Sequence, residues 1–186
     1  QKGSYVSPDT LRFDFSHFQK VTDEELRQVE RLVNKLIRAD YALDEHRDTP
    51  IEKAKEMGAV ALFGEKYGDK VRVVRFGPTC EFCGGIHAKS TGAIGMFKII
   101  SESSVAAGVR RVEAMTGKTC EEAIYVLEDT MKYIRGMLNN AKDLKATVMK
   151  FVDENARMKK EVESFRAQAV ERTAKTLVER MNVVNG

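Results

Sequence analysis

The sequence has few cysteines and no long apolar run, and these shortages exclude several classes of protein. No apolar stretch approaches the roughly 20 residues that a helix needs to cross a bilayer, so we expect no membrane-spanning segment. Three cysteines in 186 residues are an odd number, which argues against a disulfide scaffold and favours a reducing, cytoplasmic compartment. An initiator Met and an apolar leader are also missing at the start, so we expect a piece of a longer protein.

A strong charge of either sign is missing as well. The 31 basic and 28 acidic residues leave a net charge of +3, which neither requires nor excludes a nucleic-acid partner. Hydrophobic residues make up 42% of the chain and charged residues 32%, a balance typical of a folded globular protein rather than a disordered one.

Helix-breaking residues are unevenly distributed, and their distribution predicts two domains. Pro8, Pro50 and Pro78 all precede residue 119, and from there on the sequence has one internal glycine, Gly136. We therefore predict a domain over residues 1–118 and a long helix, or two helices, over residues 119–186. Apolar residues recur there at alternating steps of four and three, with a phase slip near Ala141, which is the spacing of a coiled coil. An exposed seam of this kind predicts self-association; the alternative is an amphipathic helix packed on its own domain.

The first 118 residues predict an α+β fold with a mostly antiparallel sheet covered by helices. Alternating or β-rich stretches predict strands, and three Thr-x-x-Glu boxes predict helix starts. The predicted strands are Thr10–Phe15, Ala59–Phe63, Lys70–Phe76, Phe97–Ser101 and Val109–Ala114, with a turn over Gly64–Asp69. The predicted helix starts are Thr22–Glu25, Thr49–Glu52 and Thr119–Glu122.

The segment Thr79–His87, TCEFCGGIH, carries the clearest chemistry. Cys83 and His87 are four residues apart across the pair Gly84 and Gly85, so a tight loop can turn a thiolate and an imidazole toward one zinc ion. Two ligands do not complete a site. Cys80 with His17 or His46 could complete it; alternatively, the cysteines are small core residues, or Cys83 and His87 form a nucleophile pair.

A second candidate lies in Ser101–Arg111, where small residues precede two arginines. One arginine could contact a phosphate, but Arg110 and Arg111 point to opposite faces if the strand is regular. The alternative is that both arginines are paired with acidic residues.

Six segments, in this order, resemble alanyl-tRNA synthetases in their editing domain. They cover residues 1–4 (QKGS), 11–17 (LRFDFSH), 61–69 (ALFGEKYGD), 83–87 (CGGIH), 91–95 (TGAIG) and 100–114 (ISESSVAAGVRRVEA). The long helix is similar to the family's connection toward its C-terminal domain. The resemblance implies a ligase that attaches alanine to its tRNA, and an editing domain that hydrolyses tRNA for alanine mischarged with serine or glycine.

The resemblance also implies site residues. Cys83 and His87 match the Cys-x3-His half of the family's zinc site, whereas the His-x3-His half belongs upstream of Gln1, so we expect weak zinc binding or none. Gln1 matches a glutamine that lies by the family's editing pocket. Gly84 and Gly85 are candidate backbone donors to the oxyanion of ester hydrolysis, and Lys2, Arg110 and Arg111 are candidate tRNA contacts. ATP and magnesium are implied only for the full-length parent. Ile86 departs from the family's usual Thr, which puts fine substrate selection in doubt.

Overall fold

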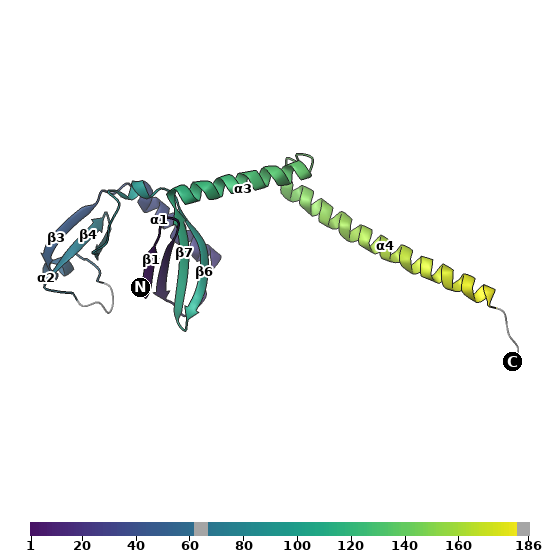
Figure 1. Ribbon diagram of the computed structural model, residues 1–186, viewed down its shortest axis with the longest axis horizontal. Helices are drawn as coiled ribbons and strands as arrows, with labels where there is room; N and C mark the ends of the chain where they lie inside the picture. The colour runs from purple at the N-terminus through teal and green to yellow at the C-terminus, as the bar shows by residue number, and fades with distance from the viewer. Residues whose placement is uncertain (62–66, 182–186) are drawn as a thin grey trace. The chain divides into compact units, whose positions relative to one another are not determined.

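The computed structural model describes residues 1–61 and 67–181, which form two compact units (Figure 1). The first unit is Gln1–Val126, and the second begins at Leu127. The α+β class with antiparallel sheets and a long C-terminal helix is confirmed. In the described part of the chain, no helix is both long and apolar enough to cross a membrane. The predicted boundary between residues 118 and 119 remains a prediction.

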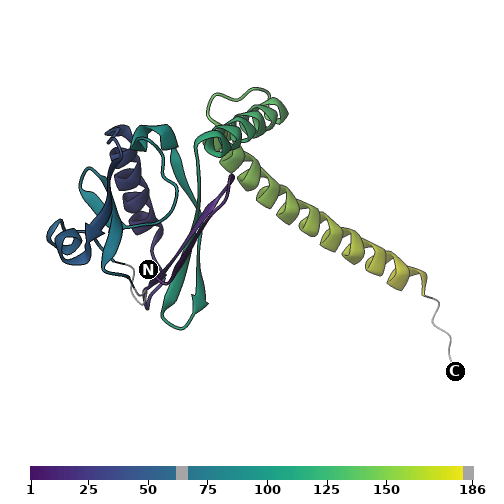
Figure 2. The same ribbon diagram turned by 60° about the vertical axis from the view of Figure 1, so that its left-hand side comes forward.

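The first unit contains two sheets. One is a four-stranded antiparallel sheet, packed against one helix and built from strands at the beginning and the end of the unit. The strand order is β1-β2-β7-β6, and α1 packs against the sheet through a small core of Ile37, Phe97 and Ala114 (Figure 2). The elements are β1 (Gly3–Val6), β2 (Leu11–Ser16), α1 (Asp23–Arg38), β6 (Phe97–Ala106) and β7 (Val109–Thr116). The strands predicted around Leu11, Phe97 and Val109 are confirmed, and β6 and β7 run further than predicted.

The capping box predicted at the start of α1 is also confirmed. The Thr22 backbone amide donates to Glu25 Oε2 at 2.8 Å, and the Glu25 amide donates to Thr22 Oγ1 at 3.3 Å. Two amides that the helix itself leaves unpaired are satisfied in this way.

A separate three-stranded sheet forms the other half, where a single sheet was expected. Its order is β3-β4-β5, all antiparallel, and α2 packs against it. The bounds are β3 (Asp44–Pro50), α2 (Ile51–Glu56), β4 (Lys70–Phe76) and β5 (Thr79–Phe82), with a 3-10 turn, η1 (Thr91–Ile94), between this sheet and β6. Its core is Ala54, Val71, Val73 and Phe82. The predicted strand β4 is confirmed, whereas β3 and β5 were not predicted.

The helices predicted at Thr49–Glu52 and Thr119–Glu122 are present, but neither threonine is the N-cap that the predicted capping boxes require. Pro50, not Thr49, is the N-cap of α2, and Thr49 belongs to β3, where its hydroxyl donates to the His46 carbonyl. Helix α3 (Gly117–Met137) begins two residues before Thr119, so Thr119 lies in its first turn. The strand predicted over residues 59–63 is not found over its described residues 59–61, where Val60 makes one isolated bridge to Glu81; residues 62 and 63 of it, and residues 64–66 of the predicted turn, lie outside the described residues.

The predicted long helix is two helices, α3 and α4 (Leu144–Arg180). The break between them includes Ala141, where the heptad phase slips, and it contains Asn139 and Asn140 in left-handed backbone conformations with φ of 53° and 57°. Asp143 then caps α4 by accepting a hydrogen bond from the Ala146 amide at 2.9 Å. No residue described in α4 is buried.

Candidate metal centre

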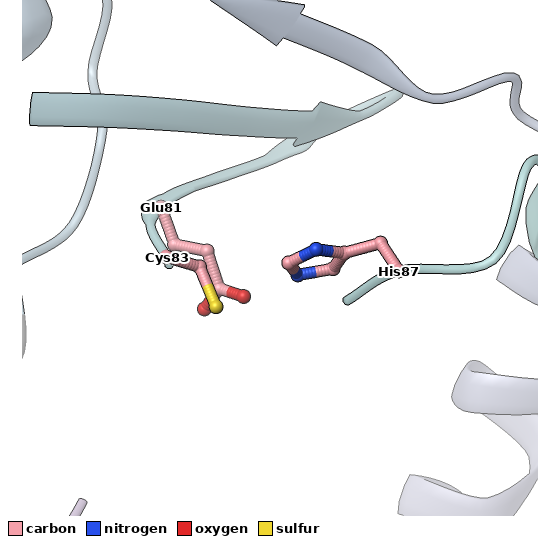
Figure 3. A group of neighbouring side chains, drawn as sticks. All are labelled: Glu81, Cys83 and His87. Atoms are coloured by element: carbon pink, nitrogen blue, oxygen red, sulfur yellow. The ribbon is translucent and has the colours of Figure 1, made fainter. Parts of the chain in front are cut away.

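Three side chains of different chemistry meet at the end of β5. One donor atom from each of Glu81, Cys83 and His87 lies within 4.8 Å of the other two (Figure 3). Carboxylate oxygen, thiolate sulfur and imidazole nitrogen are the three ligand types that zinc accepts in proteins. Three protein ligands with a position left for water are the usual arrangement of a catalytic zinc.

The alternation of side chains along β5 explains which residues come together. Phe82 is buried in the core of the three-stranded sheet, and Cys80 packs against the same cluster. Because successive side chains along a strand point to opposite faces, Glu81 and Cys83 share the other face. The suggestion that Cys80 serves as a ligand is therefore wrong for the described structure.

The other two candidate ligands, His17 and His46, also lie outside this group. His46 Nε2 pairs with Asp44 Oδ1 at 3.0 Å, and the His17 ring lies beside Phe15 with ring centroids 6.3 Å apart. Glu81 takes the third place instead. The sequence signal for Glu81 was available, since it precedes Cys83 by two residues, but it became meaningful only once β5 was known to be a strand.

His87 carries a polar atom without a partner. Its Nδ1 is buried and makes no hydrogen bond within the described structure, and its ring lies beside Phe76 with centroids 6.2 Å apart. A buried imidazole nitrogen left unpaired is costly, and a metal ion is one partner that satisfies it. The donor set fits a zinc ion held by Cys83 and His87, with Glu81 beside them.

The loop that carries Cys83 and His87 is tied to β4. Arg72 Nη1 donates to the carbonyls of Cys83 at 2.8 Å and Gly85 at 2.5 Å, and the Cys83 amide donates to the Arg72 carbonyl at 3.2 Å. Glu45 Oε1 accepts from Arg72 Nε at 2.7 Å and from Arg47 Nε at 2.5 Å. The hydrogen bonds from Arg47 and Arg72 lower the pKa of Glu45 to about 2.

An open hollow of about 610 Å³ adjoins this loop. Gly84, Gly85 and His87 are among the residues that line it. Its charged lining residues are Arg47, Lys70 and Arg72 and the acidic Glu45 and Asp48. A Cβ atom added to Gly84 would meet nothing within 4 Å, so the loop backbone is accessible there. The two glycines predicted for the pocket therefore do line a cavity beside the metal ligands.

The remaining predicted site residues lie in the four-stranded sheet or directly before its first strand. Gln1 Nε2 donates to Ser4 Oγ at 2.8 Å, and the Lys2 backbone amide donates to the Asp14 carbonyl at 2.7 Å. Their roles remain predictions.

The two arginines are held by acidic partners. Arg110 donates two hydrogen bonds to the Glu102 carboxylate. Arg111 likewise donates two to the Asp14 carboxylate, at 2.7 and 2.9 Å. The hydrogen bonds from these arginines hold the pKa values of Glu102 and Asp14 below their usual range. The alternative in which the arginines pair with acids thus describes the structure, and contact with tRNA remains a prediction.

Comparison with known proteins shows which family this region resembles. Residues 71–113, which contain all of β4 except Lys70, together with β5 and the metal loop, match the family described as "Threonyl and Alanyl tRNA synthetase second additional domain". Over all 186 residues the chain is 59% identical to an alanine--tRNA ligase of Bacteroides fragilis (strain YCH46) and 52% identical to that of Parabacteroides distasonis. Each of these two matches covers 100% of this chain and 21% of the relative. The chain therefore spans about a fifth of the length of these relatives.

Proposed function

The chain belongs to the alanine--tRNA ligase family, and from this premise we propose that it forms the part of the enzyme that removes wrongly attached amino acids. The substrate of this proposal is the tRNA for alanine carrying serine or glycine. A pocket for alanine cannot strongly reject the smaller glycine, or serine with its one extra hydroxyl, so a second hydrolytic site is needed. Attachment of alanine with ATP and magnesium is proposed for the whole protein only.

The observation that supports this proposal most directly is the group of donor atoms from Glu81, Cys83 and His87. We propose that Cys83 and His87 hold a zinc ion and that Glu81 is the third donor. With two ligands alone, Cys83 and His87, zinc binding was expected to be weak or absent. With Glu81 as a third donor, we expect the chain to bind zinc more tightly than that. When bound, zinc would supply Lewis acidity for a water molecule or for the ester carbonyl.

The chain's own residues would perform the remaining tasks. Water adds to the ester carbon, the bond to the tRNA hydroxyl breaks, and the amino acid leaves as a carboxylic acid. The amides of Gly84 and Gly85, at the hollow, are the candidate donors to the oxyanion that forms on the way. Gln1 is a candidate for contact with the substrate, as the family resemblance implies.

Binding of the tRNA end is proposed to use Lys2, Arg110 and Arg111. A guanidinium has five N–H donors, and each arginine uses two of them for its carboxylate partner. The other donors can contact a phosphate without breaking these pairs. Such contacts would make the affinity for tRNA fall as the salt concentration rises.

The test is hydrolysis of purified seryl-tRNA for alanine, together with zinc content by elemental analysis. We expect Cys83→Ala and His87→Ala to lose both zinc and hydrolysis, and Cys80→Ala, on the opposite face of β5, to keep both. Hydrolysis of the correctly charged alanyl-tRNA at the same rate would contradict an editing role. Zinc retained in both ligand variants would contradict the assigned ligands.

A second role, association through α4, is supported by a different observation. Apolar residues at heptad spacing on α4 are exposed, among them Phe151 at 52% and Phe165 at 68%. We propose that this seam is covered by a second copy of α4 in a coiled coil.

A further inference from the structure

Arg72 connects the metal loop to the middle strand of the three-stranded sheet. It lies on β4, and one of its nitrogens, Nη1, donates to two carbonyls of the loop, those of Cys83 and Gly85. The backbone of the same residue accepts a hydrogen bond from the Cys83 amide at 3.2 Å. A single residue therefore fixes the loop at its first ligand and at the second of its two glycines.

Glu45 fixes the other side of the Arg72 guanidinium. Its Oε1 accepts from Arg72 Nε at 2.7 Å, and both side chains are largely shielded, with exposed fractions of 21% for Glu45 and 22% for Arg72. Arg47 donates to the same oxygen at 2.5 Å. The planar guanidinium thus has its Nε occupied by a carboxylate from β3 and its Nη1 directed to the loop.

The loop needs an external anchor because of its composition. Gly84 and Gly85 have no side chains to restrict the backbone, and glycine loses more conformational entropy on ordering than any other residue. Between Cys83 and His87 the only other side chain is Ile86, which is fully exposed and holds nothing in place. The hydrogen bonds from Arg72 supply the restriction that these residues lack.

We propose that Arg72, oriented by Glu45, is a positioning residue of the metal centre, which keeps Cys83 and His87 at the separation that one ion requires. This inference rests on the proposed function, in which these two residues hold zinc. Arginine suits this position better than lysine, because a guanidinium bonds the carboxylate and the carbonyls through different nitrogens in fixed directions, whereas lysine keeps only the charge and one donor nitrogen. Groups that orient metal ligands typically change metal affinity by roughly 10- to 100-fold when they are removed.

The chain offers a matched control on the same strand. Arg75 also donates to a carbonyl, that of Met57 at 2.6 Å, but it lies three residues along β4 and holds the end of α2 rather than the loop. Arg75→Met therefore removes an arginine, a charge and a carbonyl hydrogen bond from β4 without touching the metal centre.

The experiment compares Arg72→Met, Arg72→Lys, Glu45→Gln and Arg75→Met with the unmodified chain. Each is titrated with Co²⁺, whose spectrum reports thiolate coordination by Cys83, and amide hydrogen exchange is followed over residues 83–87. We expect Arg72→Met to weaken Co²⁺ binding by about 10-fold or more. Arg72→Lys and Glu45→Gln should weaken it less, and Arg75→Met should leave it unchanged. Amide hydrogen exchange over residues 83–87 should be accelerated most in Arg72→Met, less in Arg72→Lys and Glu45→Gln, and not at all in Arg75→Met.

Two results would overturn the inference. One is an unchanged Co²⁺ affinity and an unchanged loop exchange rate in Arg72→Met; the other is an equal loss in Arg75→Met, which would show a general loss of stability. If the unmodified chain binds no Co²⁺, the proposed metal ligands fail, and loop exchange alone decides whether Arg72 positions the loop. Arg72→Lys and Glu45→Gln keep the test open if Arg72→Met does not fold.

Discussion

Carboxylates paired with arginines hold the local structure of the first unit at three places. Asp14 bonds Arg111, Glu102 bonds Arg110, and Glu45 bonds Arg72 as well as Arg47. In each case the hydrogen bond from an arginine lowers the pKa of the carboxylate, so the folded state favours the ionised form. Each pair therefore makes stability depend on pH in the acidic range.

Replacement of Glu45 tests over which pH range its pairs with arginine contribute to the free energy of unfolding. The folded pKa is about 2 and the ordinary value is 4.5, so the pairs of Glu45 contribute fully above about pH 4.5. The contribution is lost as the pH falls through the folded pKa. We expect Glu45→Gln to lower the free energy of unfolding at pH 7, and the difference from the unmodified chain to shrink below pH 4.5. Urea unfolding at several pH values measures this, and the exposed Glu56→Gln serves as control. A difference that stays constant from pH 7 to pH 3 would contradict the assignment.

At the metal centre, local spacing identified two residues of three. Cys83 and His87 stood out because a glycine pair between a thiol and an imidazole is an uncommon pattern. Glu81 did not stand out, because acidic residues are frequent and its role depends on the face of β5 on which it lies. The same face decides that Cys80 belongs to the core, and no spacing rule applied to Cys80 and Cys83 alone could distinguish their sides.

The elements owe their stability to small cores. In the three-stranded sheet, Val73 on β4 is fully buried and contributes to the cluster with Ala54 and Phe82. We expect Val73→Ala to lower the free energy of unfolding by about 2 kcal/mol, from lost burial and the cavity left behind. Val60→Ala, at a position 67% exposed, is the control and should have little effect. Thermal or urea unfolding followed by circular dichroism measures both, and equal effects would contradict the burial of Val73.

The start of α1 allows a prediction about capping. Thr22→Ala removes the hydroxyl that accepts from the Glu25 amide, and we expect it to lower the free energy of unfolding by about 1 kcal/mol. Thr22→Ser keeps the hydroxyl and should recover most of the loss. Urea unfolding of the three proteins measures this, and an alanine variant as stable as the serine variant would show that the cap contributes nothing.

The strands and helices differed in how well they could be predicted. Elements with clear apolar alternation or periodicity, such as β2, β4 and α1, were recognised because their pattern reflects burial of one side. Strand β3, with the sequence DEHRDTP, has almost no apolar residues and exists because it pairs with β4. Pairing of this kind is a tertiary effect, which a local pattern does not contain.

At the scale of the whole molecule, the second unit differs from the first because its long helix, α4, has no hydrophobic core of its own. Helix α4 has 37 residues and buries none of those described, so its apolar residues gain no burial within the second unit. A helix without tertiary packing has little to stabilise it beyond its own hydrogen bonds. Burial against another copy would remove this deficit.

Self-association is therefore expected to depend on one face of α4. Phe165→Glu places a charge in the heptad seam, and Ala167→Glu places the same charge two residues along, on the opposite side of the helix. We expect the unmodified chain and Ala167→Glu to form dimers as concentration rises, and Phe165→Glu to need at least about tenfold more protein, for a loss of about 1.4 kcal/mol. Sedimentation equilibrium measures this, and a monomer at all concentrations for the unmodified chain would rule out the association.

The break between α3 and α4 has a consequence for proteolysis. Lys142 lies in it, exposed, next to two left-handed asparagines and outside any helix, which makes it a preferred site for trypsin. A cut after Lys142 leaves the metal ligands and Arg72 on the N-terminal product, and the whole of α4 on the other. Limited digestion of the intact protein thus separates the residues that would carry out chemistry from those that would bring two copies together.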